Sequence, residues 1–474
     1  MKLRRIVSAV FALLMLGTVI LVSAASAEDG AGTLASAFAE PFDVIAAADT
    51  TTGNVPWAHG NNQTRLVNVS SGTYLGILTG DSYSSGDWGT TYNWSLIRVL
   101  PDGKTVEKLY SDIVYGVSTT ITVMADAEEN IWVYSGYTNP FGSVDFNVWK
   151  YDVASGEITH TMGRKKPKAK DLGYSVAFID PVANKIYAVA TTGGAGIDGD
   201  FCWNTFDITT GEWGNPQFFR EHDRYGYEYG YGDGKGGFYV LCEQSGPNDY
   251  MMSNLEGMSV GDAMRQFRSR REDANFMWDE GHLIHVIDAA NSNAYENIVI
   301  EPARYDVERG VYPNWASGEG DLLTARRDGL VYALSSQEDN GTIGIRNTVY
   351  VFDPNNGFAC LGSKVLEDLY FGADYCHRFF EDTEGNLYLV RSCQESADVE
   401  VWSLTFENGK LETKFVWFED IGGAVSAAGK KGAFFISTSR GNSTPSDIAH
   451  CIIKVESSYH YFEIDFAKIR ASMK

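Results

Sequence analysis

A short pattern of hydrophobic and polar positions recurs seven times along the chain. Each copy starts at a turn, passes through a run of apolar residues around one aromatic residue, and returns to polar residues. Short apolar runs bounded by turn residues are typical of β-strands. The central aromatic residues are Tyr74, Trp132, Tyr187, Tyr239, Tyr332, Tyr388 and Phe434. The pattern therefore predicts seven copies of one strand-based unit.

The spacing of these copies predicts the architecture. Successive aromatic positions are 58, 55, 52, 93, 56 and 46 residues apart, and all intervals but one suit four strands with their loops. A second strand pair follows each copy around a polar turn, and several of these turns end in glycine, as at Gly156 and Gly357. We therefore expect an all-β, seven-bladed β-propeller of four-stranded antiparallel blades. A sandwich or a parallel β-helix is the alternative, but a β-helix would repeat at a much shorter period.

The one long interval, between Tyr239 and Tyr332, predicts an insertion in blade four. We place it at residues 246–281, because residues 284–291 still have the pattern of the third strand of that blade. Its apolar positions fall at helical spacing beside a basic cluster, which indicates a short helical insertion. The apolar positions are Val260, Met264 and Phe267, and the basic cluster is Arg265, Arg268, Arg270 and Arg271.

The start of the chain has the features of an export signal. A positively charged start precedes an apolar run over residues 6–22 and the small-residue site Ala25-Ser26-Ala27. An uncleaved membrane anchor is the alternative. We expect removal of residues 1–27, which the mass of the exported protein would reveal, and a secreted, extracellular or periplasmic protein with no membrane span. Residues 28–58 are then a lead-in or a closing strand for the last blade, residues 59–467 the propeller, and residues 468–474 a tail.

Charge and cysteine content limit the partners. Loss of the export signal changes the net charge from −24 to −27. So negative a chain repels phosphate backbones, which argues against nucleic acid as a ligand. The six cysteines are too few for a dense disulfide framework, although Cys376 with Cys393, or Cys202 with Cys242, could be paired as well as free. No metal-ligand spacing and no cofactor motif is present, so we expect neither group, and we expect a monomer.

One face of the predicted ring is the place for a binding site. There the loops before the first strand of each blade meet the loops between the second and third strands, and we call it the loop-rich face. Arginines on this face could bind a carboxylate or sulfate bidentately, and a buried carboxyl group would gain the raised pKa of a general acid. The candidate catalytic residues are Glu228, Asp87, Tyr225 and His377. The candidate ligand-binding residues are Arg65, Arg224, Arg378, Arg391, Trp88, Arg265 and Arg268.

A period-two series of tyrosines, from Tyr225 to Tyr231, runs through the predicted first strand of blade four. Such a series places tyrosines on one face of the strand and Glu228 with three glycines on the other. Packing between blades explains the series as well as a binding site does. The basic cluster of the insertion has a second interpretation too, because it could simply balance neighbouring acidic residues.

Residues 85–92 carry a resemblance to a known family. The segment Ser85-Gly-Asp87-Trp-Gly89-Thr-Thr-Tyr92 resembles the Asp-box of BNR-repeat propellers such as sialidases, and Arg65-Leu-Val resembles their first arginine segment. The resemblance implies Arg65, Arg378 and Arg391 as carboxylate ligands, Asp87 as the acid, and Glu228 with a tyrosine as the nucleophilic pair. The box occurs once here, and seven blades are closer to propeller polysaccharide lyases than to six-bladed sialidases.

Two functions follow. In the first, the propeller recognises an acidic oligosaccharide or polysaccharide on the loop-rich face and could cleave it, as a sialidase-like glycosidase or a polysaccharide lyase. In the second, it is a non-enzymatic platform that binds an extracellular protein or a cell-envelope partner, because fold does not determine function.

Overall fold

We describe the protein from a computed structural model of the whole chain. The structure describes residues 37–48, 66–84, 90–116, 121–138, 144–165, 175–192, 200–215, 217–218, 224–247, 277–291, 293–301, 314–315, 321–338, 345–366, 375–393, 399–419, 432–436, 445–455 and 458–473.

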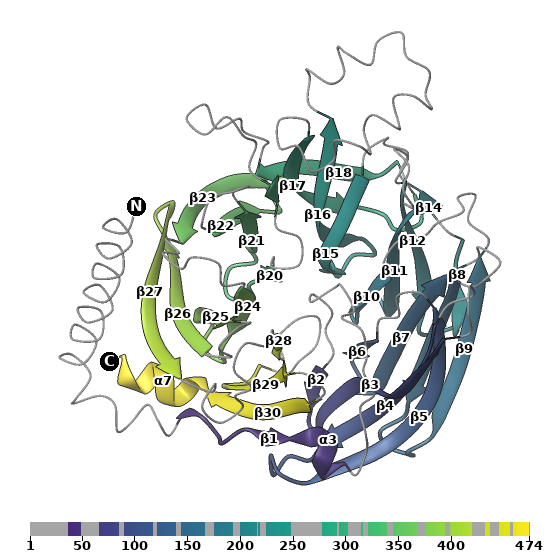
Figure 1. Cartoon of the computed structure of the whole chain (residues 1–474). Helices are drawn as coiled ribbons and strands as arrows, with labels where there is room; N and C mark the ends of the chain where they lie inside the picture. Colours follow the sequence, from purple (N-terminus) through teal and green to yellow (C-terminus); the bar gives the residue numbers. More distant parts are fainter. Residues whose placement is uncertain are drawn as a thin grey trace, which may run out of the picture.

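The described strands form seven antiparallel sheets arranged as a ring of blades (Figure 1). Blade one contains β2 (Leu66–Val69), β3 (Gly72–Ser84), β4 (Thr90–Val99) and β5 (Val106–Gly116). Blade two contains β6 (Thr122–Ala125), β7 (Ile131–Thr138), β8 (Val144–Tyr151) and β9 (Ile158–Lys165). Blade three contains β10 (Ser175–Asp180), β11 (Lys185–Thr192), β12 (Asp200–Asp207), β13 (Glu212–Trp213) and β14 (Gln217–Phe218). Blade four contains β15 (Arg224–Gly232), β16 (Phe238–Pro247), β17 (Met277–Val286) and β18 (Tyr295–Glu301).

The remaining blades complete the ring. Blade five contains β19 (Asn314–Trp315), β20 (Asp321–Thr324), β21 (Val331–Glu338), β22 (Ile345–Asp353) and β23 (Ala359–Leu366). Blade six contains β24 (Tyr375–Glu381), β25 (Leu387–Cys393), β26 (Val399–Glu407) and β27 (Lys410–Glu419). Blade seven contains β28 (Gly432–Ile436), β29 (Ile448–Val455), β30 (Ser458–Asp465) and β1 (Phe42–Asp43).

The predicted seven-bladed β-propeller is confirmed. Each of the seven signature aromatic residues lies in a different sheet, from Tyr74 in β3 to Phe434 in β28. Five sheets have four described strands, and the third and fifth sheets have five. In the described ranges, no helix combines the length and apolar character needed to span a bilayer.

Aspartates in the turns before the second strands hold these signatures in place. In blade two, Asp126 accepts the backbone N–H of Asn130 at 2.9 Å and the indole N–H of Trp132 at 2.8 Å. In blade six, Asp382 accepts the backbone N–H of Asn386 at 2.8 Å. Aspartate suits this position because its short side chain satisfies backbone donors of its own turn. The same device thus opens the second strand in blades that share little other sequence.

Apolar residues from facing sheets fill the spaces between neighbouring blades. The interface of blades five and six is typical: Leu334 and Val349 of blade five pack with Phe379 and Leu389 of blade six. Residues at period two along a strand point to the same face of a sheet. Phe379, Leu389 and the alternate positions around them therefore face blade five, whereas Phe380 and Val390 pack in the cluster shared with blade seven.

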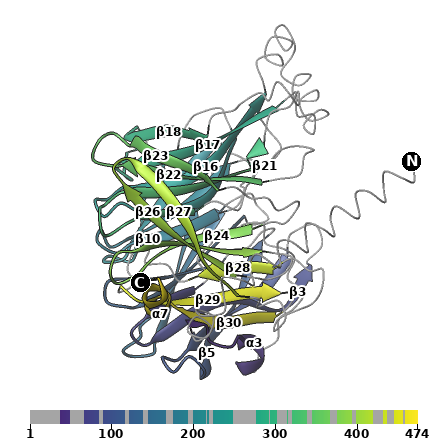
Figure 2. The same ribbon diagram turned by 90° about the vertical axis from the view of Figure 1, so that its left-hand side faces the viewer.

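The N-terminal segment closes the ring by completing blade seven. Strand β1 pairs antiparallel with β30, with Phe42 opposite Tyr461. The short helix α3 (Val44–Ala47) follows, and its buried Val44 and Ile45 pack with Leu66 and Leu75 of blade one. The C-terminal helix α7 (Phe466–Ser472) lies beside blade seven (Figures 1 and 2), and Phe466 stacks on Phe380 of blade six at 4.3 Å between ring centroids. Both ends of the described chain are thus held at the last blades.

Blade four differs from the expectation at its hairpin. Strand β16 continues to Pro247 and β17 begins at Met277, so both strands enter the range expected for the insertion. Residues 248–276, which include the predicted helix with Arg265 and Arg268, lie outside the described residues. The insertion is therefore shorter than predicted, because strand pairing continues on both sides of it.

Strand register corrects one local prediction and places two of the cysteines. The pairing of β15 with β16 shifts by one residue between Tyr227 and Tyr229, so the expected uninterrupted period of two is broken at Glu228. In blade six, Cys376 pairs with Ser392 and Cys393 pairs with Tyr375, so the two cysteines are not directly opposite each other.

Candidate functional site

Three ionisable residues form a row across blade six, at the end of the strands that belongs to the loop-rich face. His377 of β24 is the register partner of Arg391 of β25, and Arg391 is the partner of Glu400 of β26. Phe379 and Leu389 face blade five, and residues two apart on a strand share a face. His377, Arg391 and Glu400 therefore occupy the face turned toward blade five. His377 is fully buried and Arg391 is 4% exposed. The apolar interface of blades five and six thus ends in ionisable side chains near the loop-rich face.

Glu400 holds the neighbouring cation and indole together. Its Oε2 lies 3.4 Å from Nε of Arg391 and accepts the indole N–H of Trp402 at 3.0 Å. Because Glu400 and Trp402 are two residues apart on β26, their side chains share one face of the sheet. The guanidinium carbon of Arg391 lies 5.8 Å from the centre of the Trp402 ring, within the range of a cation–π contact. One carboxylate therefore fixes both groups.

A buried carboxyl group lies at the start of the innermost described strand of blade five. Asp321 of β20 is fully buried, and its Oδ2 accepts the backbone N–H of Phe379 of β24 at 2.5 Å. Burial raises the pKa of Asp321 to about 7, against the opposing effects of Arg378 and the N–H groups of Phe379 and Leu322. Arg378 is 3% exposed, and its Nη1 donates to the carbonyl oxygen of His377 at 2.5 Å. Asp321 can therefore change its charge near neutral pH.

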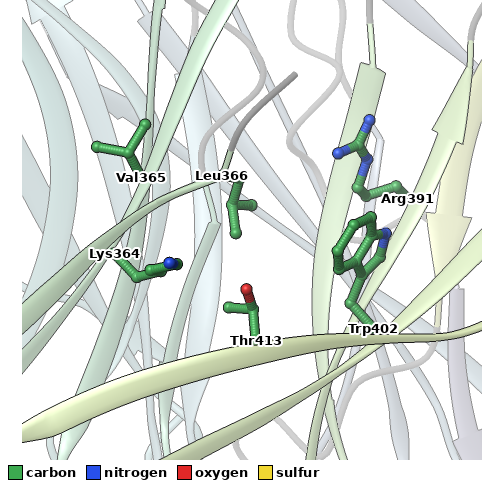
Figure 3. A pocket seen from close by; sticks show the side chains of 6 residues that line it. All are labelled: Lys364, Val365, Leu366, Arg391, Trp402 and Thr413. Carbon is green, nitrogen blue, oxygen red and sulfur yellow. The ribbon is translucent and has the colours of Figure 1, made fainter. Parts of the chain in front are cut away.

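A pocket of about 270 Å³ opens between β23 of blade five and strands β25 to β27 of blade six (Figure 3). Arg391 and Trp402 line its blade-six side, and Lys364 lines the opposite side. Val365, Leu366 and Thr413 complete the lining. The pocket thus combines two cations, one aromatic ring and one hydroxyl group in a protein of net charge −24.

The structure brings together only part of the predicted site. His377 and Arg391 lie on the face of blade six turned toward blade five, whereas Arg378 pairs with Val390 on the opposite face of the sheet and acts on Asp321 through its charge. Arg224, Tyr225 and Glu228 lie on β15. The structure describes their backbone but not their side chains. Arg65, Asp87, Trp88, Arg265 and Arg268 lie outside the described residues altogether.

The pocket contains residues that the sequence pattern does not predict as site residues. The pattern places Trp402 only in a third strand, and Lys364 and Thr413 belong to outer strands, where no binding role is expected. Glu400 directly follows the strand start at Val399 on β26. A usable signal is present, because Glu400 and Trp402 are spaced to share a face and lie just beyond Arg391 in the same hairpin.

Comparisons with known proteins agree on the fold. No family model matches the sequence, so the BNR-repeat resemblance gains no support, and no curated protein matches it either. A solved structure of polysaccharide lyase Uly1 is similar with a TM-score of 0.50 and 10% identity, over 91% of this chain and 98% of that chain. An alpha-L-arabinofuranosidase of Fusarium graminearum in complex with arabinobiose has a TM-score of 0.42 and 9% identity, over 82% and 100%.

A third similar structure is the WD40 domain of SCAP from fission yeast, with a TM-score of 0.38 and 10% identity, over 81% of this chain and 80% of that chain. At identities this low the likeness shows the β-propeller fold alone. Because the same fold serves many functions, the function of this chain has to be argued from the site.

Proposed function

We propose that this β-propeller recognises an acidic glycan on its loop-rich face. The observation that carries the proposal is the meeting of buried His377 of β24 and Arg391 of β25 on the face of blade six turned toward blade five, with Arg378 as the next residue of β24. Arginine is the side chain best suited to a carboxylate or sulfate. In a protein this acidic, a local positive site is also where an anionic ligand meets least repulsion.

Cleavage of the glycan would need an acid or a base, and Asp321 is the described residue that fits that requirement. Its pKa of about 7 lets it give or take a proton near neutral pH. Binding without cleavage is the second candidate, favoured by two observations. Asp321 is fully buried, and Glu400 is already bound to Arg391 and Trp402.

A binding and product assay tests the proposal. The chain is incubated with sialylated and uronate-containing oligosaccharides and with neutral oligosaccharides of the same length. We expect binding of an acidic probe only, weakened by salt because screening acts within about 10 Å at 0.1 M. Released sugar, or an unsaturated product that absorbs ultraviolet light, would show cleavage. Equal binding of acidic and neutral probes, or of neither, would contradict acidic-glycan recognition.

A further inference from the structure

We infer that the pocket between blades five and six binds the carboxylated sugar unit of the ligand, with the carboxylate on Lys364 and the sugar ring against Trp402. This inference rests on the proposed function and adds the position and the chemistry of one subsite. It is carried by a comparison of two blade interfaces within the same ring.

Trp402 has an equivalent in blade two. Trp149 pairs with Val133, and Trp402 pairs with Leu389. Val133 and Leu389 each directly follow the signature aromatic residue of their blade. Their partners on the outer strands are also equivalent, because Trp149 pairs with His160 and Trp402 with Phe415. The two indoles therefore occupy the same position in their blades.

At the interface of blades one and two, neighbouring side chains cover the indole of Trp149. Trp94 meets its ring edge-on at 4.9 Å, and Asp112 accepts its N–H at 3.1 Å. Tyr110 donates to the same carboxylate at 2.8 Å. Trp149 is 1% exposed as a result. No space for a ligand remains over this ring.

At the interface of blades five and six, the covering residues are different. Strand pairing, counted outward from the signature aromatic residue of each blade, makes Lys364 the equivalent of Tyr110 and Leu366 the equivalent of Asp112. An exposed lysine thus replaces a packed tyrosine, and the Trp402 N–H is satisfied from its own strand by Glu400. Trp402 remains half-buried beside the cavity. The cavity is therefore a feature of these particular side chains and not of the fold.

The lining predicts the kind of ligand. An aromatic ring offers a broad apolar face, which can pack against the C–H face of a sugar ring. Lys364 supplies a compact positive charge, and Thr413 supplies a hydroxyl group. Arg391 is offset by Glu400. Glu412, whose carboxylate interacts with Lys364, is itself paired with Lys410, so Lys364 supplies the remaining positive charge of the lining. A volume of about 270 Å³ is slightly below that of pockets for drug-sized ligands, which suits one sugar unit.

Two substitutions at Lys364 test the subsite, because this exposed side chain can be changed without opening the core. Lys364→Gln removes the charge, and Lys364→Tyr restores the residue type found at position 110. Lys414→Gln is the matched control, since Lys414 follows Thr413 on β27 and therefore points away from the pocket. The probes are an oligosaccharide of hexuronic acids and the neutral hexose oligosaccharide of equal length, and calorimetric titration measures their affinities.

We expect Lys364→Gln to weaken hexuronate binding about tenfold, the equivalent of one charge-assisted hydrogen bond at a partly exposed site. Lys364→Tyr should weaken it at least as much, and Lys414→Gln should stay within about twofold of the unchanged protein. If the unchanged protein prefers the hexuronate probe but both Lys364 variants bind it equally well, the subsite is wrong and acidic-glycan recognition stands. If the unchanged protein shows no such preference, acidic-glycan recognition fails and the subsite fails with it.

Discussion

At the scale of single residues, buried charge at the interface of blades five and six is held by specific partners. Glu400 bonds both Arg391 and Trp402, whereas Asp321 has the N–H of Phe379 and the nearby Arg378. For Asp321, burial outweighs these partners, and its pKa rises to about 7. The two carboxyl groups of one interface are thus held in different ways, and Asp321 is the one whose charge should respond to pH near neutrality.

Asp321 should make stability fall as pH rises. Its pKa rises from the ordinary aspartate value of 3.8 to about 7 on folding, so the folded state binds more protons between these values. The free energy of unfolding of the unchanged protein, minus that of Asp321→Asn, should therefore decrease between pH 4 and pH 8, by about 4 kcal/mol at most. Urea unfolding of both proteins across this range measures the difference. A difference that increases with pH would mean that Arg378 keeps the carboxylate ionised.

At the scale of elements, one side chain of helix α7 forms ion pairs with two blades, in addition to the packing of Phe466 on blade six. Arg470 forms ion pairs with Asp382 of the blade-six turn and with Asp447 before β29, the latter at 3.1 Å. The Asp382 side chain is fully buried, whereas Arg470 is 14% exposed. The same aspartate holds the turn that opens β25. The helix and the blade-six turn are therefore linked by one ion pair with a buried carboxylate.

Arg470→Met should lower the free energy of unfolding by about 2–3 kcal/mol, because it leaves a buried carboxylate without its cation. The matched control in the same helix is Lys468→Met, whose ammonium is half-exposed beside Asp465. That change should cost no more than about 0.5 kcal/mol. Urea denaturation measures both. Equal, small effects would show that the hydrogen bonds from Asn386 are sufficient for Asp382.

The elements also show what the sequence could predict. The aromatic signatures identified seven blades, because each signature depends on local features: a turn, a short apolar run around one aromatic residue and a return to polar residues. The shift at Glu228 depends on how β15 pairs with β16, and no local pattern encodes it. The pocket was missed for a similar reason. Lys364 and Trp402 come from different blades, and only the packing of those blades brings them to one cavity.

At the scale of the whole molecule, seven apolar interfaces join the blades, and two of them contain parts of the N-terminal segment. Val44 and Ile45 are 0% and 5% exposed in the cluster between blades seven and one. Strand β1 covers the edge of β30, which would otherwise be open to pairing with another chain. The ring is therefore completed by a short piece of chain.

Removal of residues 1–48 should lower the free energy of unfolding by about 3–6 kcal/mol, because two buried aliphatic side chains and the β1 pairing are lost. The comparison is the chain that begins at Glu28. Denaturant unfolding gives the energy, and light scattering should detect association through the open edge of β30. Unchanged stability and a monodisperse solution would show that blade seven is complete without β1.

The pairing of Phe42 with Tyr461 joins positions about 420 residues apart, and this fixes the order of events when the chain is made. Synthesis releases β1 near the beginning and β30 near the end, so β1 waits for its partner through almost the whole of translation. A partly made chain is an open arc of blades, and its first blade lacks its neighbour on one side. Closure of the ring is then the last step of folding, slow because it joins distant positions. Truncation near the C-terminus would therefore leave both ends of the arc exposed.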